Sequence, residues 1–487
     1  MQTTPTSAGV VQSTGRRVLV NTGALTSSSL WRIALSFVLQ VLIARGLGVA
    51  ALGQYTVAMA YLNVSQVISE LGLPVLLVRD LAQMPTRRRA YFRTALWVQM
   101  ASALLTWGGL VLLTLVLPFS ASTRPALWLV GASLPFFAVT SVCETLFQAG
   151  ERMELVMGIE MLVNLLIVAV SLVALWLGGE VLHLIGVLIL TQLFSALFCL
   201  WLVGRSGLLA EPQEGVAVSP RMLFRQAPPF LGLTLADVLL QRMDILLLSV
   251  LGGETMTGLY SAAYNLVRVA LKLIQSFGRA LYPTFSRLRH QALETYHRLA
   301  ALSLRYGLLI LLPAAALGTA LAPDLLHLVY AQDYVQAAPI FQVLLWLPPF
   351  FLLETYAVTL LMVERHPGHS LLISGLHVGV LLVAMPPLIW VGGAQGAAWA
   401  VLLAGGAGVL GSLWFLRGKR LAPALGQLWP MGAASALALV LAIWLPMAWP
   451  WRLLASATLY ALLAWFTGMV APDDIQLFRR VLRHGKG

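Results

Sequence analysis

Charged residues are scarce in this chain. Only 10% of its 487 residues are Asp, Glu, Lys or Arg, whereas 59% are hydrophobic and the mean hydropathy is +0.85. Soluble domains carry about 25% charged residues. The composition therefore excludes a water-soluble globular enzyme and predicts an integral membrane protein.

Cysteine and the usual catalytic motifs are also lacking. The two cysteines, Cys143 and Cys199, lie inside apolar runs, which excludes a disulfide framework and a CxxC metal site. The sequence has no phosphate-binding loop of the Walker type, no Gly-x-Ser-x-Gly and no His-Glu-x-x-His. We therefore expect a protein that is not an enzyme and that needs no metal ion and no cofactor.

Long hydrophobic runs fill most of the chain. A membrane-spanning helix needs about 20 apolar residues. Fourteen runs of this kind are separated by charged or Gly/Pro-bearing connections, at 18–44, 52–78, 90–117, 125–149, 155–178, 181–204, 222–251, 256–284, 299–321, 336–362, 370–391, 395–416, 421–446 and 451–470. They predict an all-α polytopic membrane protein with about 14 transmembrane helices.

The basic residues indicate the orientation of these spans. Cytoplasmic loops are rich in Lys and Arg. With the N-terminus placed inside the cell, 22 of the 31 Lys and Arg residues fall on the cytoplasmic face, three on the other face and six within spans. This split predicts an even number of spans with both termini in the cytoplasm, and it removes nucleic acid as the reason for the net charge of +12. The expected location is the cell inner (plasma) membrane.

An internal repeat is visible in short motifs. LGVAALGQY at 47–55 resembles LGGETMTGLY at 251–260, about 204 residues later. A Phe-Phe pair followed by Glu-Arg occurs at 136–152 and again at 350–365, about 213 residues later. Because six spans separate the copies, both copies enter the membrane from the same side, as a parallel repeat.

The repeat predicts two six-helix lobes followed by two additional helices. The expected parts are a cytoplasmic N-terminal tail (1–17), an N-lobe (18–205), a cytoplasmic linker (206–220), a C-lobe (221–417), the last two spans (418–470) and a cytoplasmic tail (471–487).

The eighth span carries an unusual stripe of cations. Arg268, Lys272 and Arg279 share one helical face with Gln275, and Tyr264 flanks them. A charge at mid-membrane costs about 2.5–3.5 kcal/mol even on a lenient scale, so it usually faces a partner or a wet cavity. The stripe favours an anionic ligand, although interhelical salt bridges, and snorkelling of Arg279 to the boundary, remain open alternatives.

Other polar side chains also occupy spans. Helically spaced sets are Asp237, Gln241 and Asp244 in span 7, Ser29, Arg32 and Ser36 in span 1, and Asn63, Gln66 and Glu70 in span 2; isolated ones are Glu144, Glu160, Arg242, Arg305, Glu354, His183 and His377. The two histidines are read as packed, hydrogen-bonded residues rather than ligands or proton relays. Each isolated charge has an interhelical salt bridge as its simplest interpretation.

The layout and several local patterns resemble a known family. The chain is similar to the polysaccharide or O-antigen (Wzx-type) flippase branch of the multidrug/oligosaccharidyl-lipid/polysaccharide (MOP) exporter superfamily. The patterns are LG at 47–48 with GQY at 53–55, LG at 251–252 with GLYSAAY at 258–264, LYPTFSRL at 281–288, LVYAQDYVQAAPIF at 328–341 and APDDIQLFRR at 471–480.

This resemblance implies alternating access between two lobes around a cationic cavity, and a groove for a lipid tail formed by spans 13 and 14. The implied cargo is an undecaprenyl-pyrophosphate-linked glycan moved from the cytoplasmic to the outer leaflet during exopolysaccharide or O-antigen synthesis. Further partners would be membrane lipid and, at assembly sites, a polysaccharide polymerase and glycosyltransferases. The expected substrate-binding residues are Arg32, Arg268, Lys272, Arg279, Arg305 and Tyr264, and the ion-coupling candidates are Asp237, Asp244 and Glu70.

Two other functions fit parts of the pattern. An ion-coupled multidrug exporter of the same superfamily would favour an acidic cavity and usually twelve spans. A non-transporting scaffold of a polysaccharide assembly complex needs no cavity. The cations of span 8 and the last two spans argue against the exporter.

Overall fold

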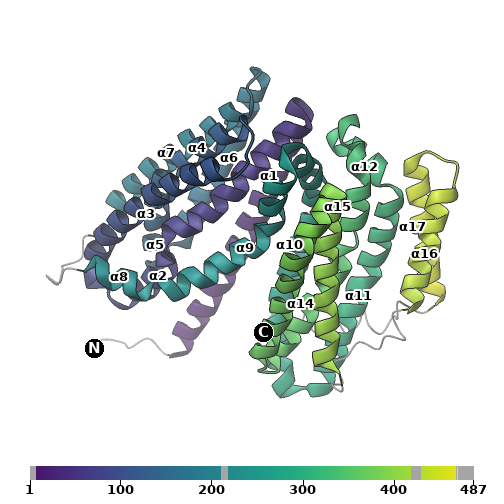
Figure 1. The fold of residues 1–487 in the computed structure, drawn as a ribbon. Coiled ribbons are helices and arrows are strands. Elements are labelled where there is room, and N and C mark those ends of the chain that lie inside the picture. The colour runs from purple at the N-terminus through teal and green to yellow at the C-terminus, as the bar shows by residue number, and fades with distance from the viewer. Residues whose placement is uncertain (1–6, 210–217, 418–428, 468, 470–487) are drawn as a thin grey trace. The chain divides into compact units, whose positions relative to one another are not determined.

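The protein is described here by a computed structural model. It describes residues 7–209, 218–417, 429–467 and 469, with side chains described from residue 34 onward apart from a few within helices. Within these ranges the regular structure is helical (Figure 1). The predicted all-α polytopic fold is confirmed.

The chain divides into two compact units, residues 1–258 and 259–487. The first contains α1 (Ser7–Glu70), α2 (Leu73–Gln83), η1 (Pro85–Arg87), α3 (Arg88–Val116), α4 (Thr123–Ala132), α5 (Leu134–Ala149), α6 (Met153–Trp176), α7 (Val181–Ser206), α8 (Pro220–Gln226) and α9 (Pro228–Leu251). The division falls one span later than the predicted linker at 206–220, because α9 packs along α1.

The second unit contains most of α10 (Gly253–Gln291), which begins in the first, and all of the later elements. These are α11 (Leu293–Ala320), α12 (Ala322–Tyr330), η2 (Gln332–Ala337), α13 (Ala338–Leu344), α14 (Leu347–Val363), α15 (Pro367–Leu416), α16 (Trp429–Trp444) and α17 (Trp449–Phe466). Figure 1 shows α11, α16 and α17 side by side, in agreement with their contacts.

Each predicted span corresponds to helix where the structure describes it, but several spans are not continuous. The run at 125–149 is divided at Ser133, just before Pro135, and the run at 336–362 is divided before the Pro348-Pro349 pair. Proline lacks the N–H that an uninterrupted helix uses and restricts the residue before it, so a helix tends to restart there. The run at 52–78 is broken at Leu71, which adopts φ 55°.

Eight helical segments in the described ranges are long and apolar enough to cross a membrane. The amphipathic α10 is not one of them, because its span carries the predicted cations. With the relatives described below, these segments make the chain a multi-pass membrane protein.

The backbone itself repeats along the chain. Gly48 and Gly253, 205 residues apart, both adopt positive φ (83° and 76°) where one span gives way to the next. Gly178 and Gly393, 215 residues apart, do the same (79° and 54°). Glycine suits these positions because it adopts positive φ without a steric penalty. The recurring turns support two copies of one six-span unit.

The turn after the fourth span of each copy corrects one detail of the sequence alignment. Glu151 and Arg365 are its left-handed residues, at φ 57° and 60°. The next N–H then returns to the helix in both copies, from Arg152 to the Phe147 carbonyl at 2.9 Å and from His366 to the Leu361 carbonyl at 2.8 Å. Glu151 is therefore equivalent to Arg365. The sequence alignment, which matched the two Glu-Arg pairs with each other, was wrong by one residue.

The two repeated glycine motifs pack against each other. A Cβ on Gly53 would lie 1.9 Å from the Glu254 carbonyl oxygen, and one on Gly258 would lie 2.1 Å from the Val49 carbonyl oxygen. The Glu254 side chain continues this contact, since it accepts hydrogen bonds from Ser120, from Ser122 at 2.9 Å and from Thr123.

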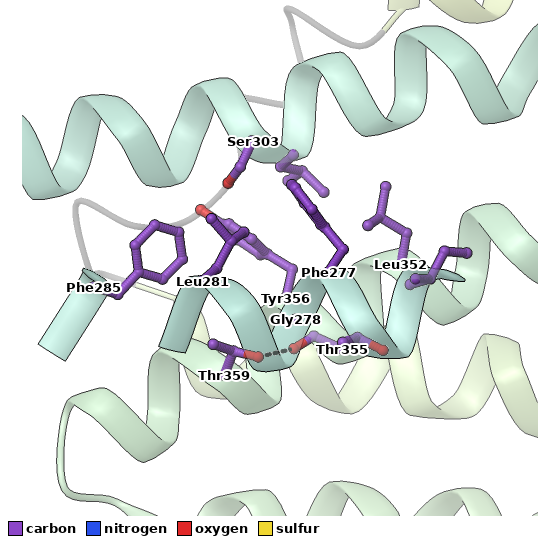
Figure 2. Close-up of a pocket in the computed structure, with 11 residues that line it drawn as sticks. Phe277, Gly278, Leu281, Phe285, Ser303, Leu352, Thr355, Tyr356 and Thr359 are labelled. Carbon is purple, nitrogen blue, oxygen red and sulfur yellow. Dashed lines mark hydrogen bonds between the residues drawn. The ribbon is translucent and has the colours of Figure 1, made fainter. Parts of the chain in front are cut away.

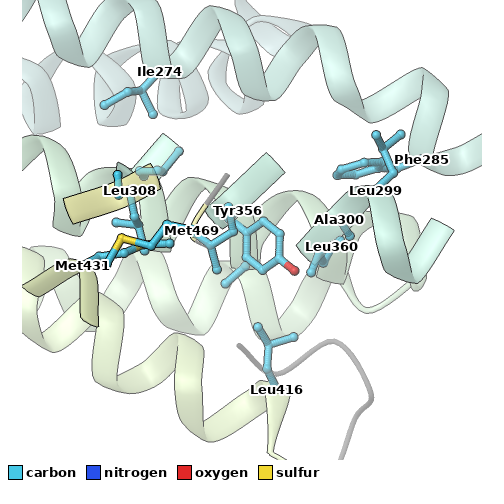
Figure 3. Close-up of a cluster of buried hydrophobic side chains, with 14 of the residues drawn as sticks. Ile274, Phe285, Leu299, Ala300, Leu308, Tyr356, Leu360, Leu416, Met431 and Met469 are labelled. Atoms are coloured by element: carbon cyan, nitrogen blue, oxygen red, sulfur yellow. The ribbon is translucent and has the colours of Figure 1, made fainter. Parts of the chain in front are cut away.

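Each unit has its own core. In the second unit, buried residues of α10, α11, α14 and α15 join Met431 of α16 and Met469 (Figure 3). The last two helices pack on α11, where Ala434, Ala438 and Ala442 are buried and the Tyr460 hydroxyl donates to the Leu309 carbonyl at 2.8 Å. Small residues allow this close approach of helices in an apolar environment.

Candidate functional site

The candidate site lies on α10, whose two long faces differ. One face is apolar and packs against α11 and α14; its buried residues include Val267, Leu271, Ile274 and Phe285. A small apolar pocket lies on this face, beside Gly278, and the side chains around it include Phe277 and Tyr356 (Figure 2). The packed face fixes the rotation of α10 about its own axis and thereby sets where its polar face points.

The second face carries the predicted stripe. Tyr264, Arg268, Lys272 and Gln275 are half-buried on it, and Arg279 is exposed. The Lys272 ammonium donates to the Gln275 amide oxygen at 3.3 Å. The ring of Tyr264 stacks on that of Tyr260, with centroids 5.6 Å apart.

Arg268 lies near the end of α12. Burial raises the pKa of the Tyr330 hydroxyl there, and the positive charge of Arg268 opposes that rise. The structure therefore places Tyr264, Arg268 and Lys272 along one helix face, as the spacing predicts.

The other expected substrate-binding residues do not lie on this helix. Arg305 is half-buried on α11. The side chain of Arg32 lies outside the described residues, although the α1 backbone around it is helical. Their part in the site stays a prediction.

The three acidic candidates have local partners in the first unit. Glu70 accepts a hydrogen bond from the Ser141 hydroxyl at 2.7 Å. Asp237 is exposed and accepts from the Gln241 amide at 2.8 Å. Asp244 is buried, and its carboxylate accepts from the Ile245 N–H at 2.8 Å. Their role in ion coupling stays a prediction.

Sequence reasoning missed one pairing. It named Glu354 and His377 separately, and the structure joins them, with Oε2 of Glu354 2.8 Å from Nδ1 of His377. The packed, hydrogen-bonded histidine was expected, but not its partner. Both residues lie near the middle of consecutive spans, and that shared depth is the signal that could have identified the pair.

Two ion pairs elsewhere in the second unit lie near helix ends. Arg289 forms a two-bond pair with Glu364, at 2.6 and 2.9 Å, between the ends of α10 and α14. Arg452 of α17 donates to Asp324 of α12 at 3.0 Å. These pairs fasten elements to one another and do not use the stripe on α10.

The last helix offers an apolar groove. Its lining side chains follow one side of α17 and the segment before it; they are Met447, Trp451, Leu454, Ala455, Thr458, Leu459 and Leu462. The groove contains one hydroxyl and no charge, which suits a hydrocarbon chain.

Comparisons with known proteins agree with this architecture. The family model described as polysaccharide biosynthesis protein matches residues 18–289, more than half of the chain and all of the α10 stripe. Comparison with curated proteins gave no match.

Three solved structures share the fold. The lipid II flippase MurJ, in an inward closed conformation, has 12% identity and a TM-score of 0.70, covering 91% of this chain and 98% of its own. An inward-facing multidrug resistance MATE family transporter of the MOP superfamily has 13% identity and a TM-score of 0.61, covering 80% and 95%. A mutant of the Vibrio cholerae MATE transporter VcmN has 14% identity and a TM-score of 0.54, covering 84% and 99%.

Proposed function

Since the chain belongs to the polysaccharide biosynthesis protein family, with the fold of MOP-superfamily transporters, we propose that it is a flippase for a polyprenyl-(pyro)phosphate-linked oligosaccharide. It carries this lipid from the cytoplasmic to the outer leaflet by alternating access, for surface polysaccharide synthesis. Both of its termini lie in the cytoplasm and it resides in the inner membrane.

The observation that carries the proposal is the polar face of α10. A lipid pyrophosphate has an anionic head that is too polar to cross hydrocarbon and a tail that is too apolar to enter water. Arg268 and Lys272 supply two positive charges one helical turn apart, and Arg279 continues the same face toward the cytoplasmic end. Charge-assisted hydrogen bonds to such groups are worth about 1.5–3 kcal/mol each. Arg32 and Arg305 are the further cations proposed to bind the same head group.

The glycan and the tail have matching surfaces of their own. Tyr264 presents an aromatic ring beside Arg268, and aromatic faces suit the apolar faces of sugar rings. The uncharged groove along α17 takes the polyprenyl chain. Asp237, Asp244 and Glu70 couple ion binding to transport or hold the cations in place.

A double substitution tests the anion site. We expect Arg268→Gln with Lys272→Gln to reduce surface polysaccharide at least tenfold at normal protein abundance, because the loss of two charge-assisted contacts exceeds the roughly 1.4 kcal/mol that corresponds to a factor of ten. The matched control is Arg221→Gln with Arg225→Gln on α8, which removes two exposed charges from the same protein. Wild-type export by the α10 variant would refute the anion site.

Native mass spectrometry of the purified protein separates the candidate functions. A retained polyprenyl-linked glycan supports the flippase. A bound small organic cation supports a multidrug exporter, the function of the MATE relatives by name. Stable association with a polymerase or glycosyltransferase, without any retained lipid, supports a scaffold.

A further inference from the structure

A buried acid and a histidine meet in the middle of the second unit. Glu354 is halfway along α14 and only 9% exposed. The long helix α15 is kinked at Gly393, which divides it into a first segment (367–392) and a second segment (394–416). His377, in the first segment, places Nδ1 2.8 Å from the Glu354 Oε2. The Glu354 side chain is 11% exposed and the His377 side chain 23%, so the imidazole is the less buried of the two groups.

A third helical segment contacts the carboxylate of this pair through a glycine. Gly408 lies in the second segment of α15, and a Cβ there would be 2.6 Å from the Glu354 Oε2. A side chain at Gly408 would therefore occupy the space of the carboxylate. The nearby Ser412 hydroxyl donates to the Gly408 carbonyl at 2.7 Å rather than to the acid. Three mid-span positions thus converge on one ionisable pair.

The elements packed around α14 bring few other ionisable groups. Gly307 of α11 abuts Leu352, so Arg305 and Tyr306 are the ionisable residues at that height on α11. Gly278 of α10 abuts Thr355, and its neighbour Arg279 is exposed. The second segment of α15 contains no ionisable residue. On α14, Tyr356 is the one ionisable residue besides Glu354. His377 is a hydrogen-bond partner of the Glu354 carboxylate, at 2.8 Å.

We propose that Glu354 and His377 form a proton-binding site in the second unit that couples proton movement to transport, with Asp237, Asp244 and Glu70 of the first unit then holding cations in place; the inference rests on the proposed flippase function. The 2.8 Å contact can form with carboxylate and imidazolium, with carboxylic acid and imidazole, or with carboxylate and the Nδ1–H tautomer of a neutral imidazole. The first two forms are neutral overall, and the third, with one proton fewer, carries one negative charge. Histidine is the side chain whose ordinary titration spans physiological pH.

The same geometry disfavours a metal cation. Hard cations are bound by several oxygen ligands. Here one carboxylate oxygen already faces a ring nitrogen, and the part of the chain that the structure describes holds no cluster of three or more His, Cys, Asp or Glu. A proton needs only the two atoms present.

The proton step is a simple exchange with water. When a proton leaves the neutral pair as H⁺, an ionised carboxylate and a neutral imidazole remain, and the pair itself then carries one negative charge. Rebinding restores the neutral pair. A buried charge is costly in an apolar environment, so the two protonation states of the pair favour different arrangements of α14 and α15. A ligand shifts a conformational equilibrium only when it binds the two conformations with different affinity, and here the proton is that ligand.

The test uses the full-length protein and two independent readouts. The first is pH-difference infrared spectroscopy of the purified protein, which detects carboxyl and imidazole protonation without any cargo. The second is translocation of an undecaprenyl-pyrophosphate-linked glycan in proteoliposomes, with and without an imposed pH gradient and with sodium replaced by choline. The variants are Glu354→Gln and His377→Gln, and His183→Gln is the matched control, a histidine that caps α7 through its Nδ1.

We expect the wild type and His183→Gln to share a pH-dependent signal that both pair variants lack. A pH gradient should change the wild-type rate at least tenfold and leave the pair variants unaffected, and choline should have no effect. Should Glu354→Gln fail to accumulate, His377→Gln, at the more exposed position, carries the test.

Two results would overturn the site: an unchanged infrared signal in both pair variants, or translocation that requires sodium and ignores the pH gradient. If the signal is present but the wild type moves no lipid-linked glycan at any pH, the proton site stands and the proposed cargo is wrong.

Discussion

Gly408 leaves space for the Glu354 carboxylate in the interior of the second unit. An alanine Cβ there would lie 2.6 Å from the Glu354 Oε2. We expect Gly408→Ala to displace the carboxylate and to be less stable than the matched control below by about 1–3 kcal/mol, the usual cost of overpacking. Thermal unfolding of the detergent-purified protein, followed by intrinsic fluorescence, measures the change.

Gly432→Ala on α16 is the matched control for this prediction. A Cβ on Gly432 would meet no atom within 4 Å, and alanine is the better helix former by about 1 kcal/mol. The control should be as stable as the wild type or more so. Equal stability of Gly408→Ala and Gly432→Ala would contradict close packing of the carboxylate against Gly408.

At the scale of helices, the two glycine motifs of the first unit pack backbone against backbone. A Cβ on Gly53 would lie 1.9 Å from a backbone oxygen of Glu254, which cannot rotate away as a side chain would. We expect Gly53→Leu to separate α1 from the start of α10 and to destabilise the protein by more than about 3 kcal/mol, in the range of severe substitutions. Protein abundance in the membrane and thermal unfolding report the effect.

Gly109→Leu on α3 changes the same residue type where a Cβ would meet nothing within 4 Å. Its abundance should remain near that of the wild type. If Gly53→Leu were equally well tolerated, the reciprocal packing of Gly53 and Gly258 would not hold the two motifs together.

Helix ends were the part of the element pattern that sequence reasoning placed least well. Hydrophobic runs located the spans, but periodicity does not show where a helix is interrupted. The breaks before Pro135 and Pro348 follow from local backbone sterics, whereas the turn at Glu151 and Arg365 uses residues with no special propensity for it. The hydrogen bonds at the helix end determine that turn. An alignment by residue identity therefore matched Glu151 with Glu364 instead of Arg365.

For the whole molecule, the even number of spans is testable with single cysteines. Cys143 and Cys199 are buried, so the wild type should react poorly with a membrane-impermeant maleimide. We expect Gln332→Cys, on an exposed connection after α12, to be labelled in intact cells. Gln83→Cys, exposed at the end of α2, should be labelled only after the membrane is permeabilised.

Met447→Cys, on the exposed connection between α16 and α17, checks the last two spans with the same reagent. Labelling in intact cells is the expected result, because two spans return the C-terminus to the cytoplasm. Labelling of Gln83→Cys and Gln332→Cys from the same side would contradict the predicted topology.

The sequence by itself determined the membrane environment, the number and order of the spans, the internal repeat and the cationic stripe of span 8. These features depend on composition and on helical periodicity, which are local properties. Only the tertiary structure joined Glu354 to His377, seated them against Gly408 and packed the two glycine motifs against each other. Such contacts depend on the rotation and depth at which separate helices pack. They cannot be predicted from the sequence because, between apolar helices in a membrane, the fit of the side chains rather than hydrophobicity determines which helices pack together.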